Sequence, residues 1–403
     1  EVAVLGAGVM GASIAGLAAS KGFGVRLREI APAPLEKGVA RARKVISGGR
    51  KKRRPASWVA ERSLKVRPAL TLAGFTRMDL VIEAIVEDLG IKQTTLREME
   101  ERVSERCVLA TNTSSIPVDR IASALRRPEG LVGLHFFNPA DRMPLVEVVR
   151  GARSAPEAVA TAVAFARKLG KTPVVTGDAP GFVVNRLLMP YLSEAMQVLI
   201  DGAGPEQVDR DLKRFGMPMG PLALLDQVGI DVAAHVAKVL EEAFPPPGAS
   251  PEGTVPRRLL EAMAAEGWLG AKSGRGFYVH QGKAHHPHDA ATAKARALAA
   301  AGRPRSSMAG ETLVARLLYP IVNEAARVIA EGVADGPAAV DVAMVLGTGF
   351  PPFLGGPLRW ADRVGLEEIV RTLDDLAETH GAHLAPSEPL AALAKGTGRF
   401  HAD

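Results

Sequence analysis

The stretch Val2-Ala3-Val4-Leu5-Gly6-Ala7-Gly8-Val9-Met10-Gly11 decides the fold of the first part of this chain. Its four leading apolar residues predict a short buried strand, and the glycines that follow form a G-x-G-x-x-G that opens a helix. Gly6 permits a tight turn, Gly8 lets the backbone approach a pyrophosphate, and Gly11 lets the helix pack closely on the strand. The stretch therefore predicts a dinucleotide-binding strand–turn–helix. The alternative is a glycine turn that binds no nucleotide.

Glu29 ends the second predicted strand, about 20 residues after the glycine turn. A carboxylate there accepts hydrogen bonds from the adenosine ribose and repels a 2′-phosphate, so it favours NAD over NADP. Arg26 and Arg28 flank it and weigh against that choice. The free N–H groups at the helix start, around Val9 and Met10, are expected to face the phosphates.

The pattern of the chain changes near residue 178. Strand-like and helix-like runs alternate over residues 1–177, which favours a parallel sheet, and only helix-like runs follow. A chain of 403 residues, 47% hydrophobic and 23% charged, is typical of a soluble protein of two or three domains. We predict an α/β Rossmann-type doubly wound domain followed by two repeated all-α helical domains.

An internal repeat underlies the prediction of two helical domains. Arg186-Leu187-Leu188-Met189-Pro190 recurs as Arg316-Leu317-Leu318-Tyr319-Pro320, and Glu194-Ala195 recurs as Glu324-Ala325 at the same offset. We therefore expect a catalytic first copy at 178–280, a linker with room for one helix at 281–305, and a structural duplicate at 306–403. The irregular spacing of the linker histidines favours a solvated segment over a metal site. These histidines are His280, His285, His286 and His288.

Several classes of protein are excluded or disfavoured by composition. No run approaches the about 18 apolar residues that a membrane helix needs, and no signal peptide is evident. The single cysteine, Cys107, excludes an internal disulfide, and we expect a buried thiol in a cytoplasmic protein. The chain has no initiator methionine and begins within a strand, so we expect it to be part of a longer polypeptide.

His135 and Glu147 form the second candidate site. His135 ends an apolar run, and the chain turns after Pro139 and returns through Leu145-Val146-Glu147-Val148-Val149. A carboxylate inside such an apolar run needs a partner. The return could place Glu147 against His135 as an imidazole base with an orienting carboxylate. The alternative is an edge-strand glutamate and a structurally bonded histidine.

Polar residues occur at two further places where a ligand could bind. Thr111-Asn112-Thr113-Ser114-Ser115 follows a predicted strand, where hydroxyls can bond a ligand or cap a helix. Asn185 lies in the apolar start of a long helix, and its counterpart in the repeat is Ala315. Because only the first copy has the polar group, that copy is expected to be the catalytic one.

Together these residues resemble the 3-hydroxyacyl-CoA dehydrogenase family over essentially the whole chain. The second helical copy is similar to the carboxyl end of the alpha subunit of the bacterial fatty-acid oxidation complex, in which a hydratase domain precedes the dehydrogenase. The resemblance rests on these motifs: 6–11, Glu83-Ala84-Ile85-Val86-Glu87, 111–115, His135-Phe136-Phe137-Asn138-Pro139, 145–149, Val184-Asn185-Arg186-Leu187-Leu188 and Gly274-Arg275-Gly276-Phe277-Tyr278.

The resemblance implies that (3S)-3-hydroxyacyl-CoA is oxidised to 3-oxoacyl-CoA with NAD⁺, in fatty-acid β-oxidation. It implies His135 as the catalytic base, Glu147 as its partner, and Ser114 and Asn185 as contacts of the reacting end. We expect this site in a cleft between the Rossmann domain and the first helical copy. The resemblance also implies residues that line the NAD site with Ser114: Ala84, Glu87 and Lys92.

The basic segment 36–67 falls where the family has a helical arm that reaches towards coenzyme A. It contains twelve basic residues and two acidic ones, and we favour at least one contact with the phosphates of CoA over a solvated charge run. We expect no nucleic acid partner. A hydratase domain and a thiolase subunit are possible partners by resemblance, and the second copy is expected to make the module monomeric. Alternatives are a non-catalytic NAD-binding descendant and a dehydrogenase of free hydroxy acids.

Overall fold

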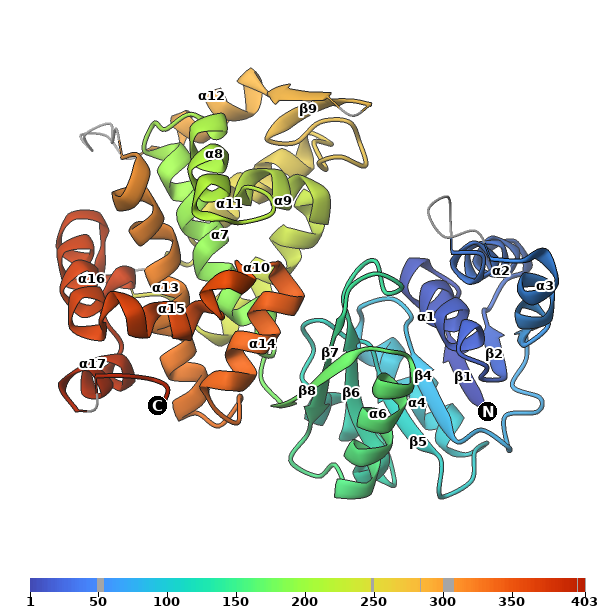
Figure 1. The fold of residues 1–403 in the computed structure, drawn as a ribbon. Coiled ribbons are helices and arrows are strands. Elements are labelled where there is room, and N and C mark those ends of the chain that lie inside the picture. Colours follow the sequence, from blue (N-terminus) through green and yellow to red (C-terminus); the bar gives the residue numbers. More distant parts are fainter. Residues whose placement is uncertain (49–53, 248–249, 283, 300–307, 397, 403) are drawn as a thin grey trace. The chain divides into compact units, whose positions relative to one another are not determined.

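Figure 1 shows the fold in a computed structural model that describes residues 1–48, 54–247, 250–282, 284–299, 308–396 and 398–402. The chain forms two compact units, Glu1–Phe182 and Val183–Asp403. The first unit ends at Phe182, beyond the predicted boundary at 177, because the Phe182 side chain is fully buried in the core of that unit.

The first unit contains an eight-stranded sheet in the order β3-β2-β1-β4-β5-β6-β7-β8. The strands are β1 (Val2–Leu5), β2 (Val25–Arg28), β3 (Val66–Ala69), β4 (Leu80–Glu83), β5 (Val108–Thr111), β6 (Leu131–Phe136), β7 (Leu145–Arg150) and β8 (Thr172–Gly177). Neighbouring strands are parallel except at β6 and β7, which are antiparallel. The strand order reverses beside β1, as in a doubly wound sheet, and this confirms the predicted fold class.

Helices cover this sheet and bury its strands. They are α1 (Val9–Ser20), α2 (Pro32–Ile46), α3 (Ala56–Ser63), α4 (Leu89–Glu100), α5 (Val118–Ala122) and α6 (Pro156–Lys168). All residues of β1, β4 and β5 are buried, so these strands are the apolar runs that the sequence showed. Strand β3 was not predicted, because it is an edge strand with exposed Arg67 and Pro68 and has no apolar alternation.

Among the residues that the structure describes, the second unit is helical apart from one hairpin. Its helices are α7 (Val184–Ile200), α8 (Pro205–Phe215), α9 (Pro221–Val228), α10 (Ile230–Ala243), α11 (Val255–Ala265), α12 (Asp289–Ala297), α13 (Gly310–Ala330), α14 (Pro337–Thr348), α15 (Pro357–Val364), α16 (Leu366–His380) and α17 (Glu388–Lys395). The hairpin pairs β9 (Tyr278–Gln281) with β10 (Ala284–Pro287). Within the predicted linker, β10 and α12 are therefore ordered elements, and α12 packs on α7.

The two copies of the repeat are held together by reciprocal ion pairs between α7 and α13, which pack side by side. Arg186 of the first copy pairs with Glu324 and Glu331 of the second. Arg316 of the second copy pairs with Glu194 and Asp201 of the first. The arginines are equivalent in the repeat, and so are Glu194 and Glu324. The contact therefore has the self-complementary pattern of a two-fold interface.

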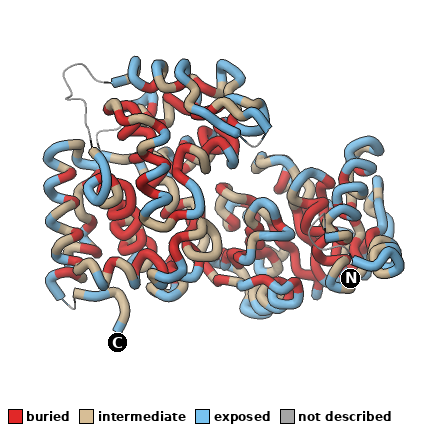
Figure 2. The backbone as a smooth tube through the Cα atoms, turned by 45° about the horizontal axis from the view of Figure 1, so that its top comes forward, coloured by how far each residue is buried: buried red, intermediate tan, exposed pale blue. Residues whose placement is uncertain are grey.

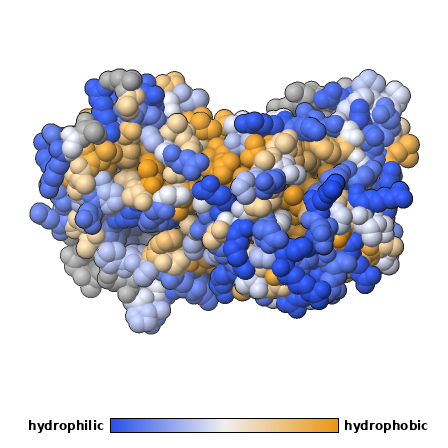
Figure 3. All heavy atoms as spheres, turned by 90° about the horizontal axis from the view of Figure 1, so that it is seen from below, coloured by the Kyte–Doolittle hydropathy of each residue, from blue (hydrophilic) through white to orange (hydrophobic). Residues whose placement is uncertain are grey.

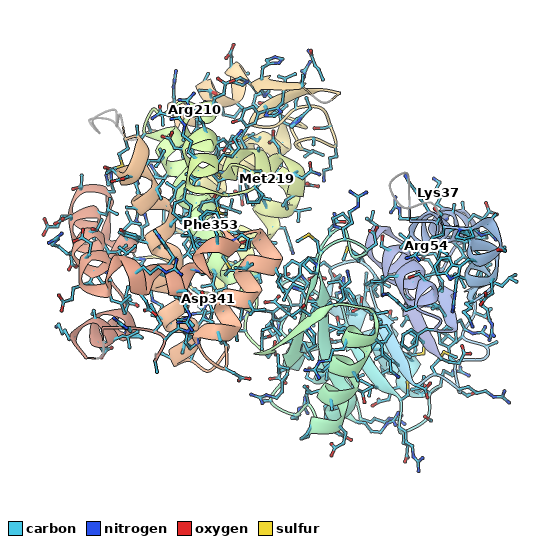
Figure 4. The ribbon with its side chains drawn as sticks, in the orientation of Figure 1. Lys37, Arg54, Arg210, Met219, Asp341 and Phe353 are labelled. Atoms are coloured by element: carbon cyan, nitrogen blue, oxygen red, sulfur yellow. The ribbon has the colours of Figure 1, made fainter. Side chains whose placement is uncertain are left out.

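Two pairs of aspartates extend the repeat to the end of the second unit. Asp209 accepts hydrogen bonds from two N–H groups at the start of α9, and its counterpart Asp341 does the same at the start of α15 (Figure 4 labels Asp341). Asp226 accepts from the backbone of 277–278, and Asp362 from that of 400–401. The closing segments 277–278 and 400–401 are therefore structurally equivalent, a match that the sequence motifs had not revealed.

The structure bears on the cysteine, on metal binding and on membrane helices. Cys107 is buried as predicted, and burial raises the pKa of its thiol to about 12. Over the part of the chain that the structure describes, no cluster of three metal-ligating side chains occurs. None of the described helices has the length and apolar character needed to cross a membrane.

Burial follows the same division between interior and surface in both units. Figure 2 shows buried residues inside each unit and exposed residues on the outer faces of its helices. On the face shown in Figure 3, hydrophilic residues cover much of the outer surface of the first unit.

Candidate active site

The carboxyl ends of four strands place the predicted polar residues of the first unit along one edge of its sheet. Strands β1, β4, β5 and β6 are parallel, so their carboxyl ends lie together. The glycine turn follows β1, Glu83 ends β4, Thr111 ends β5, and His135 is the penultimate residue of β6. Ligands of doubly wound sheets bind at this edge.

His135 and Glu147 lie opposite each other in the antiparallel pairing of β6 and β7. Directly opposed residues project from the same face of a sheet. The His135 Nδ1 and a Glu147 carboxylate oxygen are 2.7 Å apart, and the Glu147 side chain is fully buried. The predicted contact is therefore present.

The contact with Glu147 sets the tautomer of the imidazole. An ionised carboxylate can only accept a hydrogen bond, so Nδ1 donates its proton and Nε2 of a neutral ring keeps its lone pair. The rings of Phe137 and Phe182 lie beside the imidazole, with centroids at 4.4 and 5.7 Å. His135 is thus a buried imidazole whose Nε2 is suited to accept a proton.

Ser114 belongs to a loop that the Glu87 carboxylate holds. One oxygen of Glu87 accepts hydrogen bonds from the Thr113 hydroxyl at 2.6 Å, from the Ser114 N–H at 3.0 Å and from the Ser115 hydroxyl at 3.1 Å. These donors come from three successive residues after β5. The position of Ser114 is therefore coupled to Glu87, which follows β4.

Lys92 lies between two carboxylates at the same edge. Its Nζ is 2.8 Å from a Glu83 oxygen and 3.1 Å from a Glu87 oxygen, and its side chain is 1% exposed. Burial alone would raise the pKa of Glu87. The Lys92 ammonium and the hydrogen bonds from Thr113 and Ser114 together outweigh burial, so the pKa lies below its usual value. Because Lys92 is enclosed, we expect it to act on a cofactor through Glu87.

The structure reveals two polar residues whose roles sequence reasoning missed. Glu83 is fully buried and accepts hydrogen bonds from Lys92 and from the Thr111 hydroxyl, which joins the ends of β4 and β5. The side-chain oxygen of Asn112 accepts from the Phe136 N–H at 2.9 Å and ties β5 to the residue after His135. The only signal for either was a polar residue at the end of a buried strand.

The glycine turn fits a bound dinucleotide. Gly6 has a φ of +94°, and a Cβ there would lie 2.5 Å from the Ala84 carbonyl oxygen. A Cβ on Gly11 would lie 2.0 Å from the Gly6 oxygen. At Gly8 a Cβ would meet no atom within 4 Å, so the turn leaves open space at the position where a pyrophosphate would approach. Val9, the first helical residue, is half exposed.

Glu29 is tied to this turn. One of its oxygens accepts a hydrogen bond from the Ala7 N–H at 2.9 Å, and the other accepts from the Ile30 N–H at 2.7 Å. Arg26 is directed away, with its guanidinium over the Phe75 ring at 5.6 Å. The carboxylate thus lies beside the glycine turn, as ribose binding requires.

Asn185 is half-buried in the first turn of α7, in the second unit. Its predicted place beside His135 and Ser114 stays a prediction, because those residues belong to the first unit.

Family comparisons cover nearly the whole chain. The family described as 3-hydroxyacyl-CoA dehydrogenase, NAD binding domain, matches residues 1–179. The family described as 3-hydroxyacyl-CoA dehydrogenase, C-terminal domain, matches twice, at 181–280 and 313–399. The two matches coincide with the two copies of the repeat.

Individual relatives give the same result. The fatty acid oxidation complex subunit alpha of Pseudomonas savastanoi is 39% identical over 99% of this chain and 55% of its own length. The chain thus spans about half the length of the curated relatives it matches. The 3-hydroxybutyryl-CoA dehydrogenase of Escherichia coli K12 has 30% identity and a TM-score of 0.83 over 98% of both chains. The (S)-3-hydroxybutyryl-CoA dehydrogenase of Ralstonia eutropha has 35% identity and a TM-score of 0.64, over 70% of this chain and 98% of its own.

Replacing Gly8 with alanine tests the assignment of the glycine turn. The Cβ would meet no protein atom, so we expect the melting temperature of Gly8→Ala to stay near that of the wild type. NAD⁺ affinity, measured by calorimetry, should fall at least about tenfold, because the methyl group occupies the space of the pyrophosphate. Gly11→Ala is the control, since its Cβ would collide with Gly6 and should lower the melting temperature instead. Unchanged NAD⁺ affinity in Gly8→Ala would contradict the assignment.

Proposed function

Since this chain belongs to the 3-hydroxyacyl-CoA dehydrogenase family, we propose that it oxidises (3S)-3-hydroxyacyl-CoA to 3-oxoacyl-CoA with NAD⁺. The observation that carries the proposal is the buried hydrogen bond between His135 and Glu147. It makes Nδ1 the hydrogen-bond donor and leaves Nε2 as the ring atom that could remove a hydroxyl proton at the ligand-binding edge of the sheet.

In the proposed reaction, His135 Nε2 takes the proton of the substrate's 3-hydroxyl while the C–O bond becomes a carbonyl. When bound, NAD⁺ supplies the acceptor for the hydride that leaves C3. Glu147 keeps the Nδ1 proton in place and stabilises the imidazolium that forms. Ser114 and Asn185 orient the substrate oxygen. The backbone of 6–11 and the carboxylate of Glu29 would hold the dinucleotide.

Substitutions of His135 and Glu147 test this mechanism. His135→Gln removes the base, so kcat should fall by about 10²- to 10⁴-fold while the Kd for NAD⁺ stays nearly unchanged. The glutamine of Glu147→Gln can still accept a hydrogen bond from Nδ1–H but carries no charge to stabilise the imidazolium, so the loss of kcat should be smaller. The readout is reduction of acetoacetyl-CoA by NADH. Near-normal turnover of His135→Gln would show that His135 is not the catalytic base. A wild-type rate for Glu147→Gln would show that the hydrogen bond between His135 and Glu147 is only structural.

The same assay separates the proposal from its alternatives. A non-catalytic descendant would bind NAD⁺ without turnover of any acyl-CoA. A dehydrogenase of free hydroxy acids would prefer 3-hydroxybutyrate to its CoA ester. Activity across acyl-CoA chain lengths would also define the preferred substrate.

The exposed cations of α2 support recognition of coenzyme A. Lys37, Arg41 and Lys44 are exposed at helical spacing on one face of α2. Arg54 lies near Lys37 in Figure 4, with its guanidinium 4.8 Å from the Trp58 ring centroid. The remaining basic cluster, 50–53, lies outside the described residues. This face would bind the 3′-phosphate and pyrophosphate of CoA.

Charge reversal on α2 tests this binding face. We expect Lys37→Glu/Arg41→Glu/Lys44→Glu to raise KM for acetoacetyl-CoA about tenfold, since three phosphate-binding charges are inverted. KM for the N-acetylcysteamine thioester, which has no phosphate, should not change. Arg167→Glu/Lys168→Glu, at the exposed end of α6, is the control. Equal increases of KM for both thioesters would refute CoA recognition by α2.

Partners are proposed by analogy with the fatty acid oxidation complex subunits that this chain matches. We propose an enoyl-CoA hydratase domain in the parent polypeptide, a thiolase subunit as partner, and a cytoplasmic location. The reciprocal arginine–carboxylate pairs between the copies resemble a dimer interface within one chain. The 403-residue module would therefore be a monomer.

Light scattering tests the oligomeric state. We expect a molar mass near that of one chain, 42.4 kDa, because the second copy already covers the α7 face of the first. A mass near twice that value, unchanged on dilution, would contradict the proposal.

A further inference from the structure

The first turn of α7 contains the predicted substrate contact Asn185. The helix begins after Val183 without a side-chain cap hydrogen bond. Pro190, four residues after Arg186, has no N–H to donate to the Arg186 carbonyl. Contacts made by the side chains of this turn therefore contribute to fixing its position.

Arg186, the residue directly after Asn185, supplies such a contact. Its Nε is 2.6 Å from a Glu324 oxygen, and its two terminal nitrogens lie 2.5 and 2.8 Å from the two oxygens of Glu331. Its guanidinium carbon lies 4.0 Å from the Phe244 ring centroid. Burial alone would lower the pKa of Arg186. The hydrogen bonds and charges of Glu331 and Glu324 outweigh burial, so the pKa lies above its usual value. A forked contact to a buried guanidinium fixes both distance and direction.

Both carboxylates belong to the second copy of the repeat, at the middle and the end of α13. The mirrored contact, Arg316 with Glu194 and Asp201, has the same chemistry but a different setting. Arg316 lies well inside α13, which begins at Gly310, and the residue before it is Ala315. Only the contact at Arg186 therefore holds the start of a helix next to a polar group.

We propose that Glu331 and Glu324 are positioning residues for the reaction: they hold Arg186 and thereby fix Asn185 on the first turn of α7. The inference rests on the proposed role of Asn185. The second copy then acts on the active site of the first and is more than a structural duplicate. A displacement of about 1 Å at a substrate contact can cost about a hundredfold in rate, so loss of one carboxylate should be measurable.

Glu331→Gln tests the proposal, because it removes one charge from a half-exposed side chain while Glu324 remains. Asp201→Asn is the matched control, since it removes the mirrored charge while Glu194 remains on Arg316. We expect Glu331→Gln to lower kcat for acetoacetyl-CoA at least about tenfold, with KM for NADH within about twofold of the wild type. Asp201→Asn, with an equal or larger fall in melting temperature, should keep kcat within about twofold.

A double-mutant cycle separates positioning from a general loss of structure. If Glu331 acts through Asn185, Glu331→Gln should add almost nothing to the loss caused by Asn185→Ala. A full additional loss in the double variant, or equal kinetics for Glu331→Gln and Asp201→Asn, would overturn the inference and leave the proposed function intact. Failure of the proposed function is distinguishable, because the wild-type chain itself would then not reduce acetoacetyl-CoA.

Discussion

The buried carboxylate of Glu147 is the constraint on which the candidate active site depends. Its neighbours Val146 and Val148 are buried apolar residues, so an unpaired charge there would be costly. The antiparallel pairing of β6 and β7 provides the partner by placing His135 directly opposite. The reversal of chain direction in an otherwise parallel region thus has a chemical result: it brings an acid and an imidazole to one face of the sheet, where a parallel crossover would have separated them.

The sequence predicted those parts of the fold that depend on short-range patterns. The glycine turn, the return from His135 to Glu147 and the repeated Arg-x-x-x-Pro motif can be recognised within a few residues, and the structure contains all three elements. Apart from His135 and Glu147, the sequence did not predict which side chains pair with each other when they belong to different elements. Lys92 was expected to line a cofactor site, but nothing in its spacing indicated that it would be enclosed by Glu83 and Glu87. The edge strand β3 was missed because edge strands need no apolar alternation.

The repeat combines a symmetric framework with asymmetric chemistry. Asp209 and Asp341 cap equivalent helices, and Arg186 and Arg316 make equivalent ion pairs, so these structural contacts occur in both copies. The polar residue next to the arginine is not duplicated, since Asn185 aligns with Ala315 when the sequences of the two copies are compared. Removing one of the aspartates or arginines in either copy would leave a buried donor or charge without a partner. Asn185 has no such structural counterpart, because the second copy has alanine at this position.

The crossed arginine pairs have a consequence for how the second unit unfolds. Arg316 has no exposed side-chain surface, and the carboxylates that neutralise it lie on the other copy. Separating the copies would break both ion pairs of Arg316 and expose the surface that encloses its side chain. Each copy therefore contains charges that only its counterpart can satisfy. Although the two copies share a repeated pattern, they belong to one compact unit, and we expect them to unfold together rather than as two independent domains.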